Sequence, residues 1–160
     1  MNYFQITKCD MLNGDGIRVV LWVAGCSHHC KGCQNAYTWD ANAGLPFTDD
    51  TKKELFEAIA QDYISGVTFS GGDPLFVSNR AVVAGLIREI KQLFPNKTIW
   101  LYTGFTYEEL KSFPEIQPVL DDIDVIVDGK FVESLKDVDY KWAGSTNQRV
   151  LTKEMRAAIG

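Results

Sequence analysis

The chain has 160 residues and a formal net charge of −5, and 23% of its residues are charged, as in an ordinary globular protein. This length accommodates one sizeable hydrophobic core but not two, because a globular domain near 150 residues already buries about 68–70% of its unfolded surface. No apolar run approaches the ~18 residues of a membrane helix and no block of Lys or Arg stands out, so neither a membrane nor a nucleic acid is expected as a partner. The first residues lack the pattern of a secretory signal, which predicts a cytoplasmic protein.

Residues 1–17 show no clear periodicity and end in Asn13-Gly14-Asp15-Gly16. The two glycines predict either a surface turn or a close approach of the backbone to another group. The apolar run that follows, residues 18–24, is rich in β-branched side chains and predicts a strand buried on both faces of a parallel sheet.

Farther along, predicted helices and strands alternate. Helices are expected to begin near Thr48 or Asp49, to cover residues 79–93, and to begin at the capping-box-like Thr106-Tyr107-Glu108-Glu109. The expected strands are residues 66–70, 97–102 and 124–128, and the irregular end of the chain adds one more strand at most, at residues 148–151.

This alternation implies right-handed crossovers and an α/β fold whose mostly parallel sheet carries helices on its outer face. A closed eight-stranded barrel needs about 250 residues, so an open, partial (βα) barrel is expected instead. We see no linker, repeat or shift in composition, and therefore expect one domain over residues 1–160.

Three of the four cysteines, Cys26, Cys30 and Cys33, follow the first predicted strand within eight positions. In a reducing compartment such a cluster favours a metal or redox site over a disulfide framework. A structural zinc ion would need a fourth ligand, which His28, His29 or Cys9 could supply. A [4Fe–4S] cluster held by only three cysteines would keep one iron open to a non-protein ligand.

The spacing Cys26-x3-Cys30-x2-Cys33 resembles the cluster motif of radical S-adenosylmethionine enzymes, and Ser70-Gly71-Gly72-Asp73-Pro74 resembles their second motif, which holds the amino group of the cofactor's methionine. Further segments resemble the glycyl-radical-enzyme activases: Asn13-Gly14-Asp15-Gly16-Ile17-Arg18, Thr103-Gly104-Phe105 and Val127-Asp128-Gly129-Lys130-Phe131. The short length and Trp142-Ala143-Gly144-Ser145-Thr146-Asn147-Gln148 narrow the resemblance to the activases of anaerobic ribonucleoside-triphosphate reductase.

This resemblance implies a fold of the radical S-adenosylmethionine type and an oxidoreductase with two cofactors, a [4Fe–4S] cluster on the three cysteines and S-adenosyl-L-methionine. One electron from the cluster would break the S–C5′ bond, and the resulting 5′-deoxyadenosyl radical would take a hydrogen atom from a glycine in the large subunit of the reductase. A flavodoxin-type protein is the implied electron donor. The chemistry is driven by the cofactors, so no side chain is expected to be catalytic in itself.

The same resemblance suggests roles for the second motif. Gly71 and Gly72 would let the backbone approach the methionine, whose ammonium a carbonyl there would accept. Asp73 would either orient this loop or accept from the ammonium, and Pro74 would fix the turn. Radical S-adenosylmethionine enzymes commonly have an aromatic residue near the adenine where this chain has Gly32, but the activating-protein family tolerates glycine there. Backbone groups near Gly32 and Gln34 are therefore expected to contact the adenine.

Other residues carry weaker expectations. Asp128, with Lys130, would lie either at a cation site near the cofactor or at a solvated strand end. His28 and His29 could donate hydrogen bonds to sulfur, but simple exposure is the preferred interpretation. Cys9 lies outside the motif and is not expected to be a ligand. The four tryptophans are expected in the core or at an interface, and Ala143 stands where relatives commonly have Arg, which leaves the last block without an assigned role.

Two alternatives remain open at this stage. One is an activase of another glycyl radical enzyme, such as pyruvate formate-lyase. The other is a small zinc-stabilised adaptor without catalytic activity.

Overall fold

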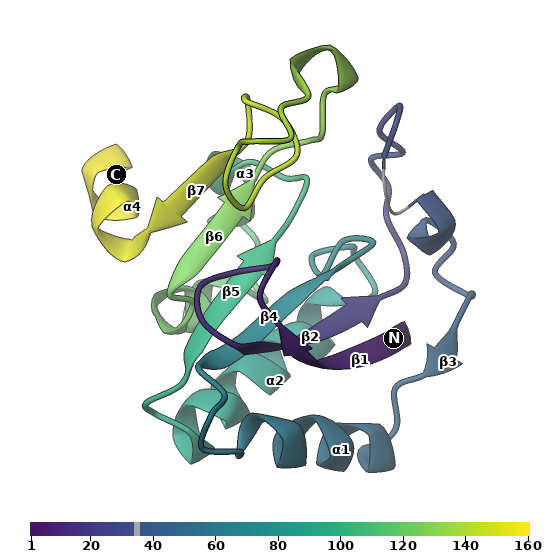
Figure 1. Cartoon of the computed structure of the whole chain (residues 1–160), viewed down its shortest axis with the longest axis vertical. Coiled ribbons are helices and arrows are strands. Elements are labelled where there is room, and N and C mark those ends of the chain that lie inside the picture. The colour runs from purple at the N-terminus through teal and green to yellow at the C-terminus, as the bar shows by residue number, and fades with distance from the viewer. Residues whose placement is uncertain (34–35) are drawn as a thin grey trace.

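The computed structural model describes residues 1–33 and 36–160 (Figure 1). Within these residues, one open seven-stranded sheet has the order β3-β1-β2-β4-β5-β6-β7. The strands are β1 Asn2–Asp10, β2 Arg18–Val23, β3 Leu45–Pro46, β4 Gly66–Gly71, β5 Thr98–Tyr102, β6 Val125–Asp128 and β7 Arg149–Thr152. The α-helices are α1 Asp49–Ile59, α2 Arg80–Leu93, α3 Tyr107–Leu110 and α4 Lys153–Ile159, and the 3-10 helices are η1 Ala36–Thr38, η2 Gln117–Asp122 and η3 Glu133–Leu135.

The centre of the sheet is parallel and its two margins are antiparallel. Strands β2, β4, β5 and β6 pair in parallel, with α1 and α2 in the connections between them. On one side β1 runs antiparallel to both β2 and β3, and on the other side β7 runs antiparallel to β6. The sheet does not close, so the expected open α/β architecture with a mostly parallel sheet is confirmed.

One face of the sheet packs against the helices. Alternate strand positions, among them Leu21, Phe69 and Leu101, join Leu55 of α1 and Ile87 of α2 in a single buried cluster. Each such side chain contributes about 1.5–3 kcal/mol through its removal from water. The expectation that the helices cover one outer face of the sheet is therefore correct.

The opposite face carries a smaller apolar cluster. Trp100, Val125 and Val127 are buried there, and Trp142 packs over them with its ring centroid 5.5 Å from that of Trp100. Because successive residues of a strand point to opposite faces, these side chains alternate with those of the helix-covered core.

The predicted helices and central strands are confirmed. Each boundary that the sequence predicts lies within one residue of the boundary in the structure. Thr48 caps α1 and Thr106 caps α3, each within a capping box in which the third helical residue bonds back to the cap. Asn79, at the start of α2, makes no side-chain cap; its amide instead donates to Ala24 O at 2.8 Å and to Asp73 O at 3.2 Å.

Among the strands and α-helices, three were not predicted: β1, β3 and α4. Strand β1 has register shifts against β2 and an irregular pattern of exposure, so its sequence lacks the two-residue period of a half-buried strand. Strand β3 is only two residues long, and α4 is a short terminal helix capped by Thr152. The predicted strand at residues 148–151 corresponds to β7, displaced by one residue.

The turn between β1 and β2 is a close approach rather than a free surface turn. Gly16 has φ +77°, and a Cβ there would lie 2.2 Å from Ser65 Oγ. Gly14 has φ +124°, and a Cβ there would lie 2.7 Å from Arg18 Cδ. Across the described part of the chain, none of the helices is both long and apolar enough to cross a membrane.

Candidate functional site

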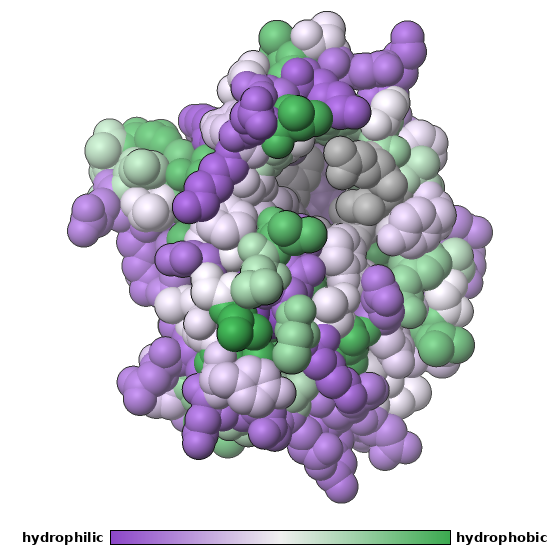
Figure 2. Space-filling model, in the orientation of Figure 1, coloured by the Kyte–Doolittle hydropathy of each residue, from purple (hydrophilic) through white to green (hydrophobic). Residues whose placement is uncertain are grey.

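The carboxyl ends of the four parallel strands meet at one edge of the sheet, and the loops that follow them form the candidate site (Figure 1). In Figure 2 the surface is hollowed between the loop that follows β2 and the loops of residues 129–148. Lys31, Phe131, Val132 and Glu133 line a pocket in this region. Ligands of open α/β sheets bind outside the carboxyl ends of the strands, so this hollow is the expected location of a cofactor.

Backbone hydrogen bonds hold the start of the cysteine loop. Gly25 N donates to Thr38 O at 2.7 Å, and Cys26 N donates to Trp39 O at 3.1 Å. Within the loop, Cys33 N donates to Cys30 O at 3.1 Å. All four cysteines are thiols rather than disulfides, and the three of the motif are half-buried, whereas Cys9 is exposed on β1.

The electrostatics of the loop are those of a set of interacting thiols. Burial raises the pKa of Cys26, and the backbone N–H groups of His28 and His29, which donate to its sulfur, oppose that rise. Burial also raises the pKa of Cys30, opposed by the N–H of Phe131. The charge of Asp73 and, to a smaller extent, that of Cys30 add to the rise in the pKa of Cys26, and the charge of Cys33 adds to the rise in the pKa of Cys30.

These thiols fit an iron–sulfur cluster. Their mutual repulsion as thiolates is relieved when they share a cationic metal centre, and backbone N–H donors to ligand sulfurs are a common part of such sites.

Trp39, whose indole stacks on His29 with ring centroids 4.5 Å apart, has a buried Nε1 without a hydrogen-bond partner. Among the described residues, no three His, Cys, Asp or Glu side chains are grouped so as to hold a single metal ion.

The glycine-rich segment after β4 lies directly against the cysteine loop. Gly72 N donates to Val23 O at 2.9 Å, and Asp73 N donates to Gly25 O at 2.7 Å. Gly71 has φ +110°, and a Cβ there would lie 2.5 Å from Val23 N; at Gly72 it would lie 2.4 Å from Gly25 O. Both glycines are therefore required by the close approach of two protein segments. Pro74 is buried in the turn that follows.

Asp73 is buried and its carboxylate is fully engaged by the protein. Its oxygens accept from Leu75 N at 2.9 Å, Thr103 Oγ1 at 2.9 Å and Gly104 N at 3.0 Å. His28 Nε2 lies 2.7 Å from Asp73 Oδ2, and the two side chains are only 5% and 1% exposed. These contacts favour the loop-orienting alternative for Asp73. The preferred expectation that His28 is exposed is wrong, whereas His29 is exposed as expected.

Asp128 is not at a solvated strand end. It is 1% exposed, accepts from Tyr107 N at 2.7 Å and forms an ion pair with Arg149, whose Nε lies 3.0 Å from Asp128 Oδ1. The hydrogen bond to Asp128 raises the pKa of Arg149, and a second bond to Glu108 acts in the same direction. A guanidinium thus compensates the buried carboxylate, while Lys130 is exposed. Sequence reasoning missed Arg149, because its place opposite Asp128 depends on the β6–β7 register, which only the folded sheet shows.

Comparisons with known proteins show the family to which the chain belongs. A family model described as a 4Fe-4S single cluster domain matches residues 12–151. The anaerobic ribonucleoside-triphosphate reductase-activating protein of Enterobacteria phage T4 is 45% identical over 150 residues, which cover 94% of this chain and 93% of the relative. The protein of the same name from Escherichia coli (strain K12) is 42% identical over 152 residues, which cover 94% of this chain and 97% of the relative.

The chain belongs to the anaerobic ribonucleoside-triphosphate reductase-activating proteins. A third member of this family, from Pasteurella multocida (strain Pm70), is 39% identical over 92% of this chain and 95% of its own length. The expected family is thus confirmed on nearly the whole chain.

In this member of the family, the block from Trp142 to Gln148 supports the loop after β6. The Gln148 side-chain oxygen accepts from Gly144 N at 2.9 Å and Ser145 N at 3.0 Å, and its Nε2 donates to Gly129 O at 3.0 Å. Ala143 packs with the smaller apolar cluster, so this block is held without an arginine at that position.

Gly32 is exposed and has φ +74°, and a Cβ there would lie 3.0 Å from Glu133 Cδ. The cysteine loop therefore passes close to the segment after β6 at this point. Gln34, the other residue expected near the adenine, lies outside the described residues.

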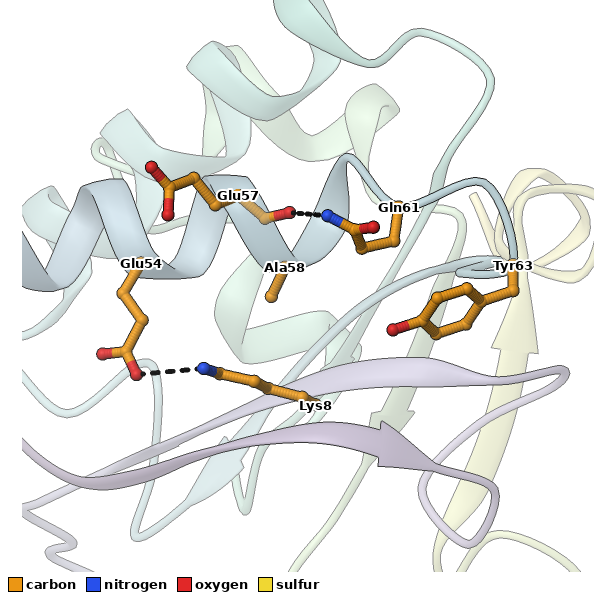
Figure 3. Close-up of a pocket in the computed structure, with 6 residues that line it drawn as sticks. All are labelled: Lys8, Glu54, Glu57, Ala58, Gln61 and Tyr63. Carbon is orange, nitrogen blue, oxygen red and sulfur yellow. Dashed lines mark hydrogen bonds and ion pairs between the residues drawn. The ribbon is translucent and has the colours of Figure 1, made fainter.

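A second pocket lies between β1 and α1 (Figure 3). Lys8 pairs with Glu54 at 3.5 Å across it, and Gln61 Nε2 donates to Glu57 O at 3.1 Å. Tyr63, at its end, precedes the amino end of β4, whereas the glycine-rich segment follows the carboxyl end of that strand. The pocket thus lies toward the opposite edge of the sheet from the cysteine loop.

Proposed function

We propose that this chain is a radical S-adenosylmethionine activase: it uses a [4Fe–4S] cluster and S-adenosyl-L-methionine to generate a glycyl radical on the large subunit of an anaerobic ribonucleoside-triphosphate reductase. The observation that carries the proposal is the hydrogen-bonded contact between the three-cysteine loop and the glycine-rich segment, through Asp73 N and Gly25 O. The names of the relatives and the iron–sulfur family model support the same activity. We further propose that residues 1–160 form a single domain with a partial barrel of the radical S-adenosylmethionine type.

Cys26, Cys30 and Cys33 would hold three irons and leave the fourth without a protein ligand, which we assign to the amino and carboxylate groups of S-adenosyl-L-methionine. When bound, the cluster supplies the electron that cleaves the sulfonium and starts hydrogen-atom abstraction from a glycine of the partner. The protein's contribution is position, because holding the two reactants together makes electron transfer effectively intramolecular.

The remaining site residues would shape the binding of the cofactor. Backbone groups of Gly71 and Gly72 are proposed to receive the methionine ammonium, with Pro74 and Asp73 fixing their loop. Backbone groups at Gly32 and Gln34 are proposed to face the adenine. Asp128 would act indirectly, because its carboxylate is engaged by Arg149 and by the first turn of α3.

A protein substrate suits a hollow that opens at the surface, as this one does (Figure 2). A glycine has no Cβ, so a loop that presents glycine can insert deeply with its α-carbon unobstructed. A flavodoxin-type protein is the proposed source of the electron.

The test is to mix the reduced protein, S-adenosyl-L-methionine and the reductase without oxygen and to record electron paramagnetic resonance spectra. A glycyl radical that requires all three components is expected. Cys26→Ala, Cys30→Ala and Cys33→Ala should each abolish it, whereas the matched variant Cys9→Ala should retain it.

Two results would contradict the proposal. One is a radical formed on another glycyl radical enzyme but not on the reductase. The other is one zinc ion and no iron in the anaerobically purified protein.

A further inference from the structure

The middle of the cysteine loop is attached to the rest of the site by the side chain of His28. The start of this loop is held by backbone bonds at Gly25 and Cys26. There the imidazole Nε2 lies 2.7 Å from Asp73 Oδ2, and both side chains are almost completely buried. An ionised carboxylate only accepts hydrogen bonds, so with Asp73 ionised Nε2 is the donor.

Through Asp73, this contact joins three loops. The carboxylate belongs to the segment after β4, and it also accepts from Thr103 Oγ1 and Gly104 N in the loop after β5. With His28 from the loop after β2, one buried carboxylate connects the carboxyl ends of three adjacent strands. Charged hydrogen bonds in a buried environment are stronger than neutral ones, so this is a rigid connection.

The loop after β5 is shaped to receive the imidazole. A Cβ on Gly104 would lie 2.3 Å from His28 Cδ2, so any other residue at this position would displace the ring. Phe105 makes an edge contact with the ring, with centroids 4.5 Å apart. The Arg80 guanidinium lies over the Phe105 ring, 5.3 Å from its centroid, and so supports that ring. The Thr103-Gly104-Phe105 motif therefore contacts both the His28 ring and the Asp73 carboxylate.

His28 also reaches the candidate cluster ligands. Its own backbone N–H donates to the sulfur of Cys26, so the same residue binds a thiol through its main chain and Asp73 through its side chain. His29, next in the chain, differs: it is exposed, has φ +47° and stacks on Trp39. Of the two histidines, His28 is the one whose side chain contacts the glycine-rich segment.

We infer that His28 is a positioning residue that fixes the cysteine loop relative to the glycine-rich segment, and that it thereby determines how tightly S-adenosyl-L-methionine is held beside the cluster. This inference rests on the proposed function, because it assigns the two segments to the two ends of one cofactor. His28 acts through Asp73 and the loop, not by contact with the reacting atoms.

The experiment compares His28→Ala, His28→Gln and Gly104→Ala with the wild type, all loaded with iron and sulfide under anaerobic conditions. Iron content, the dissociation constant for S-adenosyl-L-methionine, and the electron paramagnetic resonance spectrum of the reduced protein with and without this cofactor are measured. Asp62→Asn, at an exposed position outside the loops of the site, is the control.

We expect His28→Ala and Gly104→Ala to retain iron, to bind the cofactor about tenfold more weakly, and to lose most of the spectral change that it induces. His28→Gln should recover part of the affinity, because its amide can donate to Asp73. Asp62→Asn should bind as the wild type does.

If iron-loaded His28→Ala binds S-adenosyl-L-methionine as tightly as the wild type does, the inference about His28 is overturned but the proposed function is not. A joint loss of iron and affinity in His28→Ala that His28→Gln does not relieve would also overturn the inference, because that pattern belongs to a purely structural residue. Failure of the wild type to bind S-adenosyl-L-methionine would instead overturn the proposed function, and this inference with it.

Discussion

Two aspartates lie at the ends of β6, and the negative charge of each is compensated by a different set of groups. Asp128, at the carboxyl end, pairs with Arg149. Asp124, just before the amino end, accepts from Lys91 Nζ at 2.9 Å and from Ile99 N at 2.7 Å, with Lys153 at 3.4 Å. The sequence placed both aspartates at the ends of a strand correctly. It could not identify their partners, because these come from elements far along the chain that only the folded sheet brings together.

Asp124 makes the stability of the protein depend on pH. Burial by itself would raise the pKa of this carboxyl, but the bonds from Ile99 N–H and Lys91 and the nearby lysine charges lower it below its ordinary value. A depressed pKa stabilises the folded state above the unfolded value of about 3.9 and ceases to do so as the pH falls through the folded value. Asp124→Asn should therefore lower the free energy of unfolding by about 1–2 kcal/mol at pH 7, and by much less near pH 3.

Urea unfolding of the apoprotein at the two pH values measures this difference. Asp62→Asn, at an exposed position, is the control and should change little at either pH. An equal loss at pH 7 and pH 3 in Asp124→Asn would show that the charge of Asp124 is not responsible.

At the scale of elements, strand ends were the most informative part of the sequence. The cysteine loop and the glycine-rich segment were each predicted to follow a strand, because an apolar run and a turn motif are local signals. The outer elements β1, β3 and α4 lack such signals, since half-exposed or very short segments have no clear period. The reason why glycine is needed at these two positions could not be predicted either. Gly71 and Gly72 pack against the backbone of a neighbouring segment, and the pattern of residues within one segment does not indicate such a contact.

Gly71→Ala tests this packing. The added Cβ would lie 2.5 Å from Val23 N and 2.6 Å from Val23 O, and φ is +110°. We expect a loss of about 2–3 kcal/mol in the free energy of unfolding, since neither the strained backbone nor the adjacent strand can yield cheaply. Gly85→Ala in α2 is the matched control: no atom lies within 4 Å of its added Cβ, so it should be stabilising by up to about 1 kcal/mol. Equal stability of the two variants in urea unfolding would contradict the packing argument.

For the molecule as a whole, the candidate site is assembled from loops at one edge of an open sheet. Its cysteines lie within eight residues, so their chemistry could be predicted from the sequence alone. The connections that hold the site span much longer separations, 45 residues between His28 and Asp73 and 30 between Asp73 and Thr103. Such contacts form because β2, β4 and β5 lie side by side in the sheet. The order of the strands is not evident from a single sequence, so these contacts could not be predicted from it.

Because metal bound to these thiols would be bound only in the folded state, assembly of the cluster should stabilise the entire domain. Binding at a free-ligand concentration near one hundred times the dissociation constant contributes about 2.7 kcal/mol, which corresponds to a rise of about 5–10 °C in Tm for a chain of this size. Thermal unfolding followed by circular dichroism before and after anaerobic reconstitution measures this rise. It should persist in Cys9→Ala, whose replaced thiol is exposed on β1, and disappear in Cys30→Ala. Loss of the rise in Tm in Cys9→Ala would instead indicate that Cys9 is a fourth metal ligand. In that case the cluster would have no open iron, and the proposed chemistry depends on one.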